Sequence, residues 1–194
     1  MDKKPTTDLS KEISECVKVL QEGGLILYPT DTVWGIGCDA TNEAAVAKVY
    51  ELKRRPDSKA LICLVANDFM LEKHVEEVPD LAYDLMDMST KPTTIIYDRP
   101  KGLAKNLVAE DNTLAIRVAS DDFCRKLIGK FGKPIVSTSA NISGEPTPKS
   151  FSEISSDILK GVDYAVNLQR QVINNTPSAI IRLATDGTVK VIRT

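Results

Sequence analysis

The chain has 194 residues, of which 42% are hydrophobic and 27% charged, and its formal net charge is −2. This composition is ordinary for a compact globular domain and argues against a disordered chain. The small negative charge argues against a broad cationic surface for nucleic acid and favours a small acidic ligand held at a local basic site. We expect one domain over residues 1–194, without an additional C-terminal domain.

The four cysteines and the N-terminus indicate the compartment and the metal chemistry. The cysteines are widely spaced, form no Cys-x-x-Cys pair and have only His74 as an imidazole partner, which argues for reduced thiols and against zinc. No apolar stretch reaches the length that spans a membrane, and the polar N-terminus leads into an amphipathic segment. We expect a cytoplasmic protein with no metal site of its own and no membrane partner.

The first half of the chain alternates helical and strand-like patterns. Helical spacing of apolar residues after a cap at Asp8 or Ser10 stops at Gly23-Gly24, and an apolar run then predicts a strand buried on both faces. Asn42 can cap a second helix. The elements predicted here are a helix over 9–22, a strand over 25–28, a helix after Asn42 and a strand over 60–65.

The second half continues this alternation and ends in a hairpin. The predicted elements are a helix over 81–88, strands over 93–97 and 114–118, a helix opened by Ser120 and the two aspartates after it, a strand at Ile135-Val136, a helix over 152–159, and strands over 179–183 and 189–192. Asp186-Gly187 is the strongest short-range hairpin signal in the chain. Strands that alternate with helices predict a mixed α/β sheet, with ligands at the strand ends where the loops gather.

Residues 28–38 follow the first predicted strand and are dense in proline, glycine and hydroxyl side chains. A shaped binding loop and an ordinary turn with Asx-type hydrogen bonds explain this composition equally well. Trp34 could be a platform for a ligand, but we expect this single tryptophan in the core.

Lys53-Arg54-Arg55 end the second predicted helix immediately before Pro56, and Lys59 adds a fourth cation nearby. A solvated helix end, where cations meet the C-terminal dipole, is one explanation. A binding role is the other, because Pro56 stops the helix and confines the cations to one loop. The planar fork of arginine and the mobile charge of lysine would suit a triphosphate tail beside an amino-acid carboxylate.

Residues 137–144 line up small hydroxyls and an amide with almost no bulk, as an anion or nucleotide cradle requires. A polar turn is the alternative. A serine nucleophile is disfavoured, since there is no Gly-x-Ser-x-Gly elbow and His74 stands alone among charged residues. A Walker A loop and a Gly-x-Gly-x-x-Gly fingerprint are also missing, so a nucleotide would be held by another device. Together with the cation run, this segment suggests a pocket that handles phosphate.

Four segments in this order carry a resemblance to a known family: Tyr-Pro-Thr-Asp-Thr-Val-Trp-Gly-Ile-Gly from Tyr28, Leu-Lys-Arg-Arg-Pro from Leu52, Leu-Ala-Ile-Arg-Val from Leu114 and Ser-Thr-Ser-Ala-Asn from Ser137. Together they closely resemble the YrdC-type (TsaC) threonylcarbamoyl-AMP synthases over nearly the whole chain. The resemblance implies an open twisted α/β sheet with a positively lined concave cleft. It also implies a reaction that joins L-threonine, bicarbonate and ATP into threonylcarbamoyl-AMP and releases pyrophosphate.

The resemblance assigns roles residue by residue. It places the family's catalytic tetrad, Lys-x-Arg and Ser-x-Asn, on Lys53, Arg55, Ser139 and Asn141, and leaves Arg54 to solvent or a surface ion pair. It implies threonine contacts at Thr32, Arg117, Ser137 and Ser178. It implies ATP contacts at Arg55, Lys59, Thr113, Ser139, Thr147 and Arg193. The sequence offers no carboxylate cage for metal, so we expect Mg²⁺ to be held mainly by the substrate phosphates.

The resemblance also names partners and an alternative. The product would feed tRNA modification through downstream tRNA threonylcarbamoyl transferase proteins. The alternative is an RNA-binding YrdC/YciO-like paralogue without synthase activity, which would contact tRNA or double-stranded RNA, but the net charge and the intact tetrad motifs weigh against it. The chain departs from the family at residues 89–94, where many members carry a Pro-Gly-Pro-Leu-Thr turn. The resemblance also implies that the linker that closes over the cleft in longer relatives is missing or replaced here.

Overall fold

The computed structural model describes residues 8–55, 61–174 and 176–194, which form one α/β domain around a mixed sheet. The strands are β1 (Ile26–Tyr28), β2 (Gly35–Gly37), β3 (Ile62–Val65), β4 (Thr93–Asp98), β5 (Thr113–Val118), β6 (Ile135–Ser139), β7 (Tyr164–Ala165), β8 (Ala179–Leu183) and β9 (Val189–Arg193). Their order in the sheet is β7-β1-β2-β6-β3-β5-β4-β8-β9. Three neighbouring pairs are parallel, β1 with β7, β3 with β5 and β4 with β8, and the others are antiparallel. The predicted mixed α/β sheet is confirmed.

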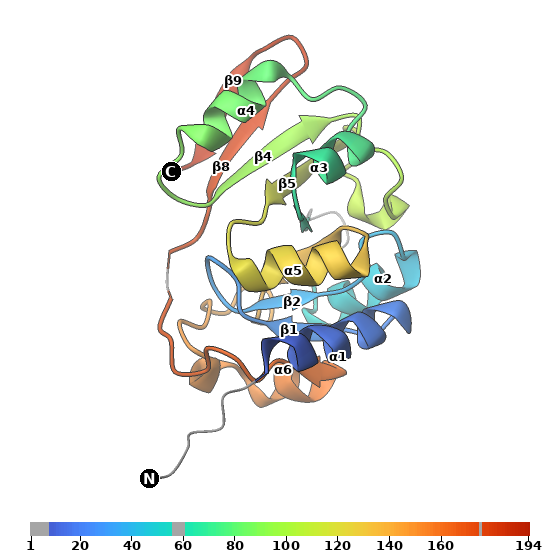
Figure 1. Cartoon of the computed structure of the whole chain (residues 1–194), viewed down its shortest axis with the longest axis vertical. Helices are drawn as coiled ribbons and strands as arrows, with labels where there is room; N and C mark the ends of the chain where they lie inside the picture. The colour runs from blue at the N-terminus through green and yellow to red at the C-terminus, as the bar shows by residue number, and fades with distance from the viewer. Residues whose placement is uncertain (1–7, 56–60, 175) are drawn as a thin grey trace.

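The helices pack on this sheet and connect its strands. They are α1 (Leu9–Gln21), α2 (Glu43–Leu52), α3 (Asp68–His74), α4 (Asp80–Asp87), α5 (Asp122–Phe131) and α6 (Ser156–Gly161), with short 3-10 turns η1 (Lys105–Leu107) and η2 (Phe151–Glu153). In Figure 1, α1 and α5 lie side by side across the part of the sheet that holds β1 and β2. None of the helices in the described part of the chain has the length and apolar character needed to cross a membrane.

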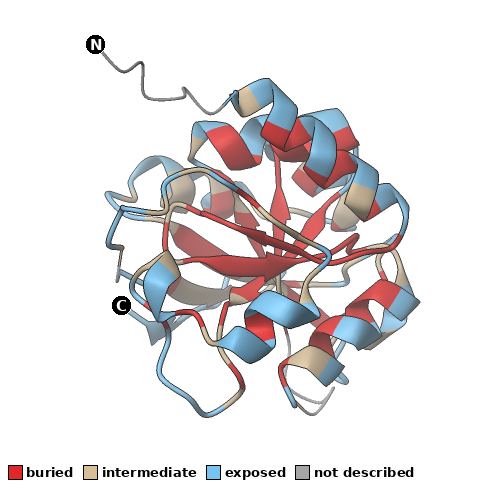
Figure 2. Cartoon of the chain, turned by 90° about the horizontal axis from the view of Figure 1, so that it is seen from below, coloured by how far each residue is buried: buried red, intermediate tan, exposed pale blue. Residues whose placement is uncertain are grey.

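Alternate side chains of the central strands enter two separate hydrophobic clusters, one on each face of the sheet. Leu27 and Cys63 pack in the cluster that α2, α3 and α6 cover, whereas Ile26 and Leu64 pack in the cluster that α1 and α5 cover. Because side chains alternate along a strand, these apolar runs are buried on both sides, and each fully buried aliphatic side chain stabilises the fold by about 1.5–3 kcal/mol. Figure 2 shows the buried strands between helices whose outer faces are exposed.

The predicted caps at Asp8 and Asn42 and the terminal hairpin are confirmed, since these two side chains accept backbone N–H groups at the starts of α1 and α2. The helix expected to open at Ser120 is α5, and it is capped one residue later, by Asp121. Asp186 accepts the N–H of Thr188 in the turn between β8 and β9, where Gly187 has a φ of 85°. Glycine adopts this left-handed conformation without a steric cost. The Asp-Gly pair therefore predicts the hairpin for the same reason that the turn forms there.

The hydroxyl-rich segment was expected as a loop, and this prediction is wrong for its first three residues. Ser137–Ser139 continue β6, in which Thr138 and Ser139 pair with β2 on one side and Ser137 pairs with Ile62 of β3 on the other. The sequence analysis missed β2 altogether, because a Gly-Ile-Gly tripeptide gives no strand pattern. The glycine at position 37 is required instead by the lack of room for a side chain between β2 and its neighbours. A Cβ on Gly37 would lie 2.7 Å from the Tyr28 ring and 2.8 Å from the Val136 carbonyl oxygen.

Three smaller expectations also need correction. The helix predicted over 152–159 is split into η2 and α6, because the Ser155 side chain caps a new helix. Helix α3 and strand β7 were not predicted. The strand expected over 60–65 begins at Ile62, and its first residue lies outside the described residues. In the divergent segment 89–94, the Thr93 hydroxyl donates to Ser89 Oγ at 2.9 Å and closes the turn before β4.

We expect Gly37→Ala to lower the free energy of unfolding by about 1–3 kcal/mol, because the added methyl group must displace backbone and a buried ring. Gly35→Ala is the matched control in the same strand. Its Cβ would meet neighbours at 3.4 Å or more, so its effect should stay below about 1 kcal/mol. Denaturant titration of both variants checks this, and equal losses would show that the contacts of Gly37 do not specify β2.

Candidate active site

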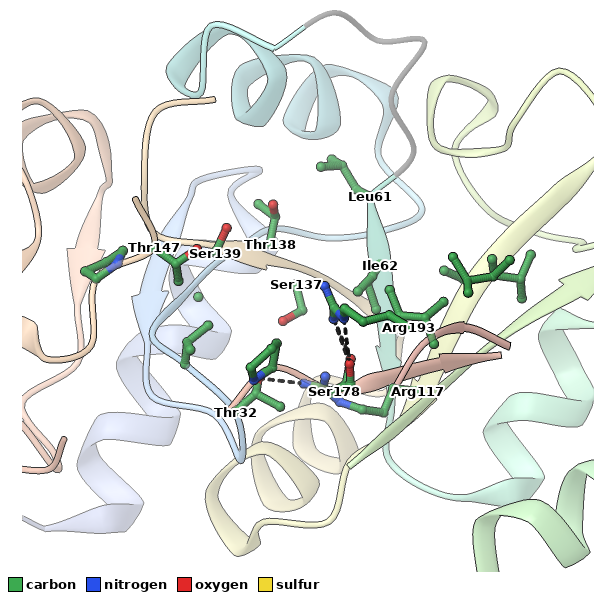
Figure 3. Close-up of a pocket in the computed structure, with 18 of the residues that line it drawn as sticks. Thr32, Leu61, Ile62, Arg117, Ser137, Thr138, Ser139, Thr147, Ser178 and Arg193 are labelled. Atoms are coloured by element: carbon green, nitrogen blue, oxygen red, sulfur yellow. Dashed lines mark hydrogen bonds between the residues drawn. The ribbon is translucent and has the colours of Figure 1, made fainter. Parts of the chain in front are cut away.

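A cavity of about 550 Å³ lies on the sheet face that α1 and α5 cover, beyond the part that these helices reach. Alternation places Ser137 and Ser139 on the same side of β6 as Ile135, which packs in the α1–α5 cluster. Ala115 and Arg117 of β5 also line the cavity. Figure 3 shows Ser137, Ser139 and Arg117 around the cavity, on strands that are distant in sequence. Strand residues thus form part of the cavity wall, and loop residues such as Thr32 and Ser178 form the rest.

Four cations line the cavity, and no aspartate or glutamate is among its described lining residues. The cations are Arg55, Arg117, Lys149 and Arg193. Burial, and then the positive charge of Arg117, lower the pKa of the Arg193 guanidinium, and burial also lowers the pKa of Arg55. Positive charges held this close repel one another, and a bound anion would lower this repulsion. The electrostatics favour a ligand with several negative charges.

Arg117 is held by a buried ion pair. Its Nη2 lies 2.9 Å from Asp31 Oδ1, with the two side chains 4% and 8% exposed, and lies 3.5 Å from Thr32 Oγ1. Asp31 Oδ2 accepts the hydroxyl of Ser120 at 2.6 Å. The Nε of Arg117 is buried and makes no hydrogen bond within the described residues. Asp31 thus fixes one side of the guanidinium, while the Nε–H remains available to an acceptor.

A second polar network ties the C-terminal hairpin to the cavity wall. Arg193 donates through Nε and Nη2 to the carbonyl oxygen of Ser178, at 2.9 and 2.8 Å. The Ser178 hydroxyl shares a hydrogen bond of 2.9 Å with the fully buried Thr94 hydroxyl. Figure 3 shows Arg193 folded over Ser178 in this way. Ser178 is therefore oriented from two sides, by β4 and by β9.

Lys53 lies behind the cavity wall. Its side chain is 1% exposed, is not part of the cavity lining, and donates to the backbone carbonyl oxygens of Ser139 at 2.5 Å and Asn141 at 2.7 Å. Burial, and then the charge of Arg55, lower the pKa of Lys53 from 10.5 to about 8. The carbonyl dipoles are the groups that solvate this buried ammonium.

Arg54 and Arg55 separate as the sequence predicts. Arg54 adopts a left-handed φ of 50°, and its exposed side chain pairs with Asp157 at 3.1 Å. Because this turn carries Arg54 outward, Arg55 reaches the cavity two residues after Lys53. The expectation of a surface ion pair for Arg54 is confirmed.

The remaining predicted site residues divide into two groups. Eight line the cavity: Thr32, Arg55, Arg117, Ser137, Ser139, Thr147, Ser178 and Arg193. Lys53, Asn141 and Thr113 do not, and Lys59 lies outside the described residues. The Asn141 amide nitrogen donates to the carbonyl oxygens of Ile142 and Glu145, and the Thr113 hydroxyl donates to Asp111. The roles of all these residues stay predictions.

Sequence reasoning missed three polar residues of the site. Asp31 stood within the quoted motif but received no role, Thr94 stood in the divergent turn, and Lys149 had no signal beyond its position two residues after Thr147. Their contributions depend on contacts between strands far apart in sequence. Such contacts cannot be derived from local spacing.

The described residues contain no group of three histidine, cysteine, aspartate or glutamate side chains that could hold a metal ion. The four cysteines are reduced and buried. Burial raises the pKa of their thiols, to about 12 for Cys16, which keeps them protonated and unreactive. Trp34 is buried and packs edge-on against Phe151, which confirms its expected place in the core.

We expect Asp31→Ala to lower the free energy of unfolding by about 3–5 kcal/mol, because it leaves the Arg117 guanidinium buried without a counter-charge. Asp157→Ala removes the acid from the exposed pair with Arg54 and should change stability by less than about 1 kcal/mol. Chemical denaturation of both variants checks this. If the two variants lost a similar free energy of unfolding, the buried pair would stabilise the fold no more than the exposed pair does.

The lowered pKa of Lys53 predicts a pH dependence of stability. Between about pH 8 and 10.5 the unfolded chain keeps the lysine proton that the folded chain has released. Since the unfolded state then binds more protons, the free energy of unfolding rises with pH in this window, by up to about 3 kcal/mol. Lys53→Met should lack this rise in the free energy of unfolding, because methionine does not titrate. Denaturation of both proteins from pH 7.5 to 10 measures the difference, and parallel pH profiles would contradict the prediction.

Comparison with known proteins gives the family. The Sua5/YciO/YrdC family model, described as "Telomere recombination", matches residues 18–194. A threonylcarbamoyl-AMP synthase of Pseudoalteromonas translucida is 34% identical over 91% of this chain and 95% of its own length. A second, from Photobacterium profundum, is 36% identical over 75% of this chain and 80% of its own length.

Solved structures agree with this assignment. Sua5 of P. abyssi, as an H234A/Y235A variant, superimposes with a TM-score of 0.86 at 26% identity and matches 97% of this chain, which spans 57% of that protein. The same protein complexed with L-threonine gives 0.79 at 27% identity, over 91% of this chain and 52% of that one. E. coli YciO gives 0.82 at 26% identity, over 94% and 88%. The chain belongs to the Sua5/YciO/YrdC family.

Proposed function

We propose that this protein is an L-threonylcarbamoyladenylate synthase, a nucleotidyltransferase that condenses L-threonine, bicarbonate and ATP into threonylcarbamoyl-AMP and pyrophosphate. The observation that carries the proposal is the cavity itself, in which four cations and several hydroxyls converge without a carboxylate among the described lining residues. Three substrates that each carry an anionic group must meet in such a reaction, and this lining offers positive charge to those groups. The names of the related synthases support the same activity.

The threonine subsite in this proposal is built around Arg117. Its buried Nε–H has no other acceptor within the described residues, and a carboxylate is the natural partner for a guanidinium whose other side is already held by Asp31. Thr32, Ser137 and Ser178 supply hydroxyls from three different segments around it. A related Sua5 structure was determined with L-threonine, which supports an amino-acid subsite in this fold.

We assign Arg55, Ser139, Thr147 and Arg193 of the cavity lining to ATP, together with Lys59 and Thr113. Arg193 lies against Ser178, so in this proposal the nucleotide adjoins the threonine subsite. Arg55 and Arg193 carry the charge that the triphosphate and the departing pyrophosphate require. In the tetrad, Arg55 and Ser139 can contact the substrate directly, whereas Lys53 and Asn141 stand behind them.

The chemistry needs positioning more than reactive side chains. The neutral threonine amine attacks the carbon of bicarbonate, and water leaves as N-carboxythreonine forms. A carboxylate oxygen of this carbamate then attacks the α-phosphorus of ATP in line as the bond to pyrophosphate breaks. No covalent link to the protein forms. The cavity contributes by holding the reacting anions together and by placing fixed positive charge where negative charge develops.

The lining does not fit a protein-held magnesium site, since its described residues offer no carboxylate. We therefore propose that Mg²⁺ is bound through the phosphates of ATP. The proposal further includes one YrdC-like domain over residues 1–194, a cytoplasmic location, and delivery of the product to tRNA threonylcarbamoyl transferase proteins for tRNA modification.

Pyrophosphate release tests the proposal. In the presence of ATP, Mg²⁺ and bicarbonate, release should depend on L-threonine. Arg117→Ala should raise the KM for threonine by roughly 10- to 100-fold, and Arg55→Ala should raise the KM for ATP to a similar extent, because each variant loses hydrogen bonds to a charged group. Arg54→Ala is the matched control and should behave as the wild type, since Arg54 pairs with Asp157 at the surface.

The outcome that would refute this function is the absence of threonine-dependent pyrophosphate release from folded wild-type protein. RNA binding that weakens steeply with salt, without ATP turnover, would instead favour the RNA-binding alternative. Equal loss of activity in the Arg54 and Arg55 variants would show that the cation run acts through general charge and not through the cavity.

A further inference from the structure

Lys53 occupies an unusual place for a cation beside an anion site. It is the C-cap of α2 and 1% exposed, and it does not line the cavity, although Arg55 two residues later does. A lysine used for phosphate binding normally presents its ammonium as a mobile point charge. Here the side chain runs behind β6 and ends on backbone atoms.

The contacts of Lys53 form a clamp between two segments. Its Nζ donates to the carbonyl oxygens of Ser139 and Asn141, and its own carbonyl oxygen accepts the N–H of Ser143 at 2.8 Å. These three bonds join the end of α2 to the point where β6 stops and the chain leaves the sheet. Ser139 is the last residue of β6, and its side chain lines the cavity.

Burying this ammonium costs free energy, which indicates that its two bonds to backbone carbonyl oxygens are the main contribution of Lys53. Burial and the nearby charge of Arg55 both disfavour the protonated form, as the lowered pKa records. No acid in the described residues forms an ion pair with it, so the two carbonyl groups carry its solvation. Two of the three N–H donors of the ammonium are used on these carbonyl oxygens, and Lys53 is not among the residues that line the cavity.

We propose that Lys53 is a positioning residue: it holds the Ser139 and Asn141 carbonyls, thereby fixes the Ser139 hydroxyl in the cavity wall, and does not itself touch the nucleotide. This inference rests on the proposed function, because it concerns the residue that would contact ATP. It divides the tetrad into Arg55 and Ser139, which face the cavity, and Lys53 with Asn141, which shape the backbone behind them.

A double-mutant cycle tests this assignment. Lys53→Met should lower kcat/KM for ATP at least about tenfold in the wild-type background, because small displacements of a positioned group are costly. In a Ser139→Ala background the same change should have little further effect, since the group that Lys53 positions is gone. Arg54→Met, in the same turn, is the matched control and should leave kcat/KM unchanged in both backgrounds.

Hydrogen exchange in the ligand-free protein supplies a second readout. Lys53→Met should speed exchange of the backbone amides of residues 140–145, including that of Ser143, at least about tenfold while exchange in α5 stays near the wild-type rate. Arg54→Met should not change exchange there, because Arg54 pairs with Asp157 at the surface. This comparison needs neither ATP nor turnover. If the wild type shows no synthase activity, the proposed function fails, and exchange still decides whether Lys53 holds the segment.

Three outcomes would overturn the proposal. Additive losses from Lys53→Met and Ser139→Ala, with unchanged amide exchange, would make Lys53 an independent ligand of ATP. A lower Tm with intact kcat/KM would make it purely structural. If Lys53→Met does not fold, Lys53→Gln keeps an uncharged donor at this place: kcat/KM within about tenfold of the wild type would support positioning by hydrogen bonds, and a larger loss would contradict it.

Discussion

The constraint on which the rest of the structure depends is that the central strands are buried on both faces. Each of these strands sends alternate side chains into two clusters, so helices must cover both sides of the sheet. The α1–α5 pair covers only part of its face, and the uncovered part is where β5 and β6 carry arginine and serine in place of aliphatic residues. The fold and the site therefore both follow from the alternation of side chains between the two faces of each strand. On the face that α1 and α5 cover, these side chains are apolar under the helices and polar in the cavity.

The charges around the cavity are balanced in three different ways. Arg117 has a carboxylate, Arg193 has the backbone carbonyl and hydroxyl of Ser178, and Lys53 has two backbone carbonyls. Only the first of these partners carries a full negative charge, and the described lining of the cavity contains no carboxylate. Backbone dipoles can hold a cation in place without cancelling its attraction for an anion. This explains how a chain with a net charge of −2 can contain a cationic pocket.

Sequence reasoning succeeded where local chemistry decides the outcome. The caps at Asp8 and Asn42 and the turn at Gly187 depend on residues a few positions apart, and apolar runs located most of the strands. It failed for β2, in which Gly37 is required by the Tyr28 ring and a carbonyl oxygen of the neighbouring strand. Most of the predicted site residues share one cavity, because motif matching carries information about distant contacts. That matching could not say that the ammonium of Lys53 turns away from the cavity, because a side chain's direction is set by the partners that surround it.

The edge strand β9 forms an exposed boundary of the cavity. All five of its residues are exposed, and it pairs with β8 alone, yet Ile192 and Arg193 form part of the cavity lining. Edge hairpins with few buried contacts open at a lower free energy than the domain core. Loss of this strand removes one wall of the cavity, so a ligand that contacts Arg193 binds only the closed form. Ligand concentration then sets the fraction of molecules in which the last strand is folded, and binding and local folding become one equilibrium.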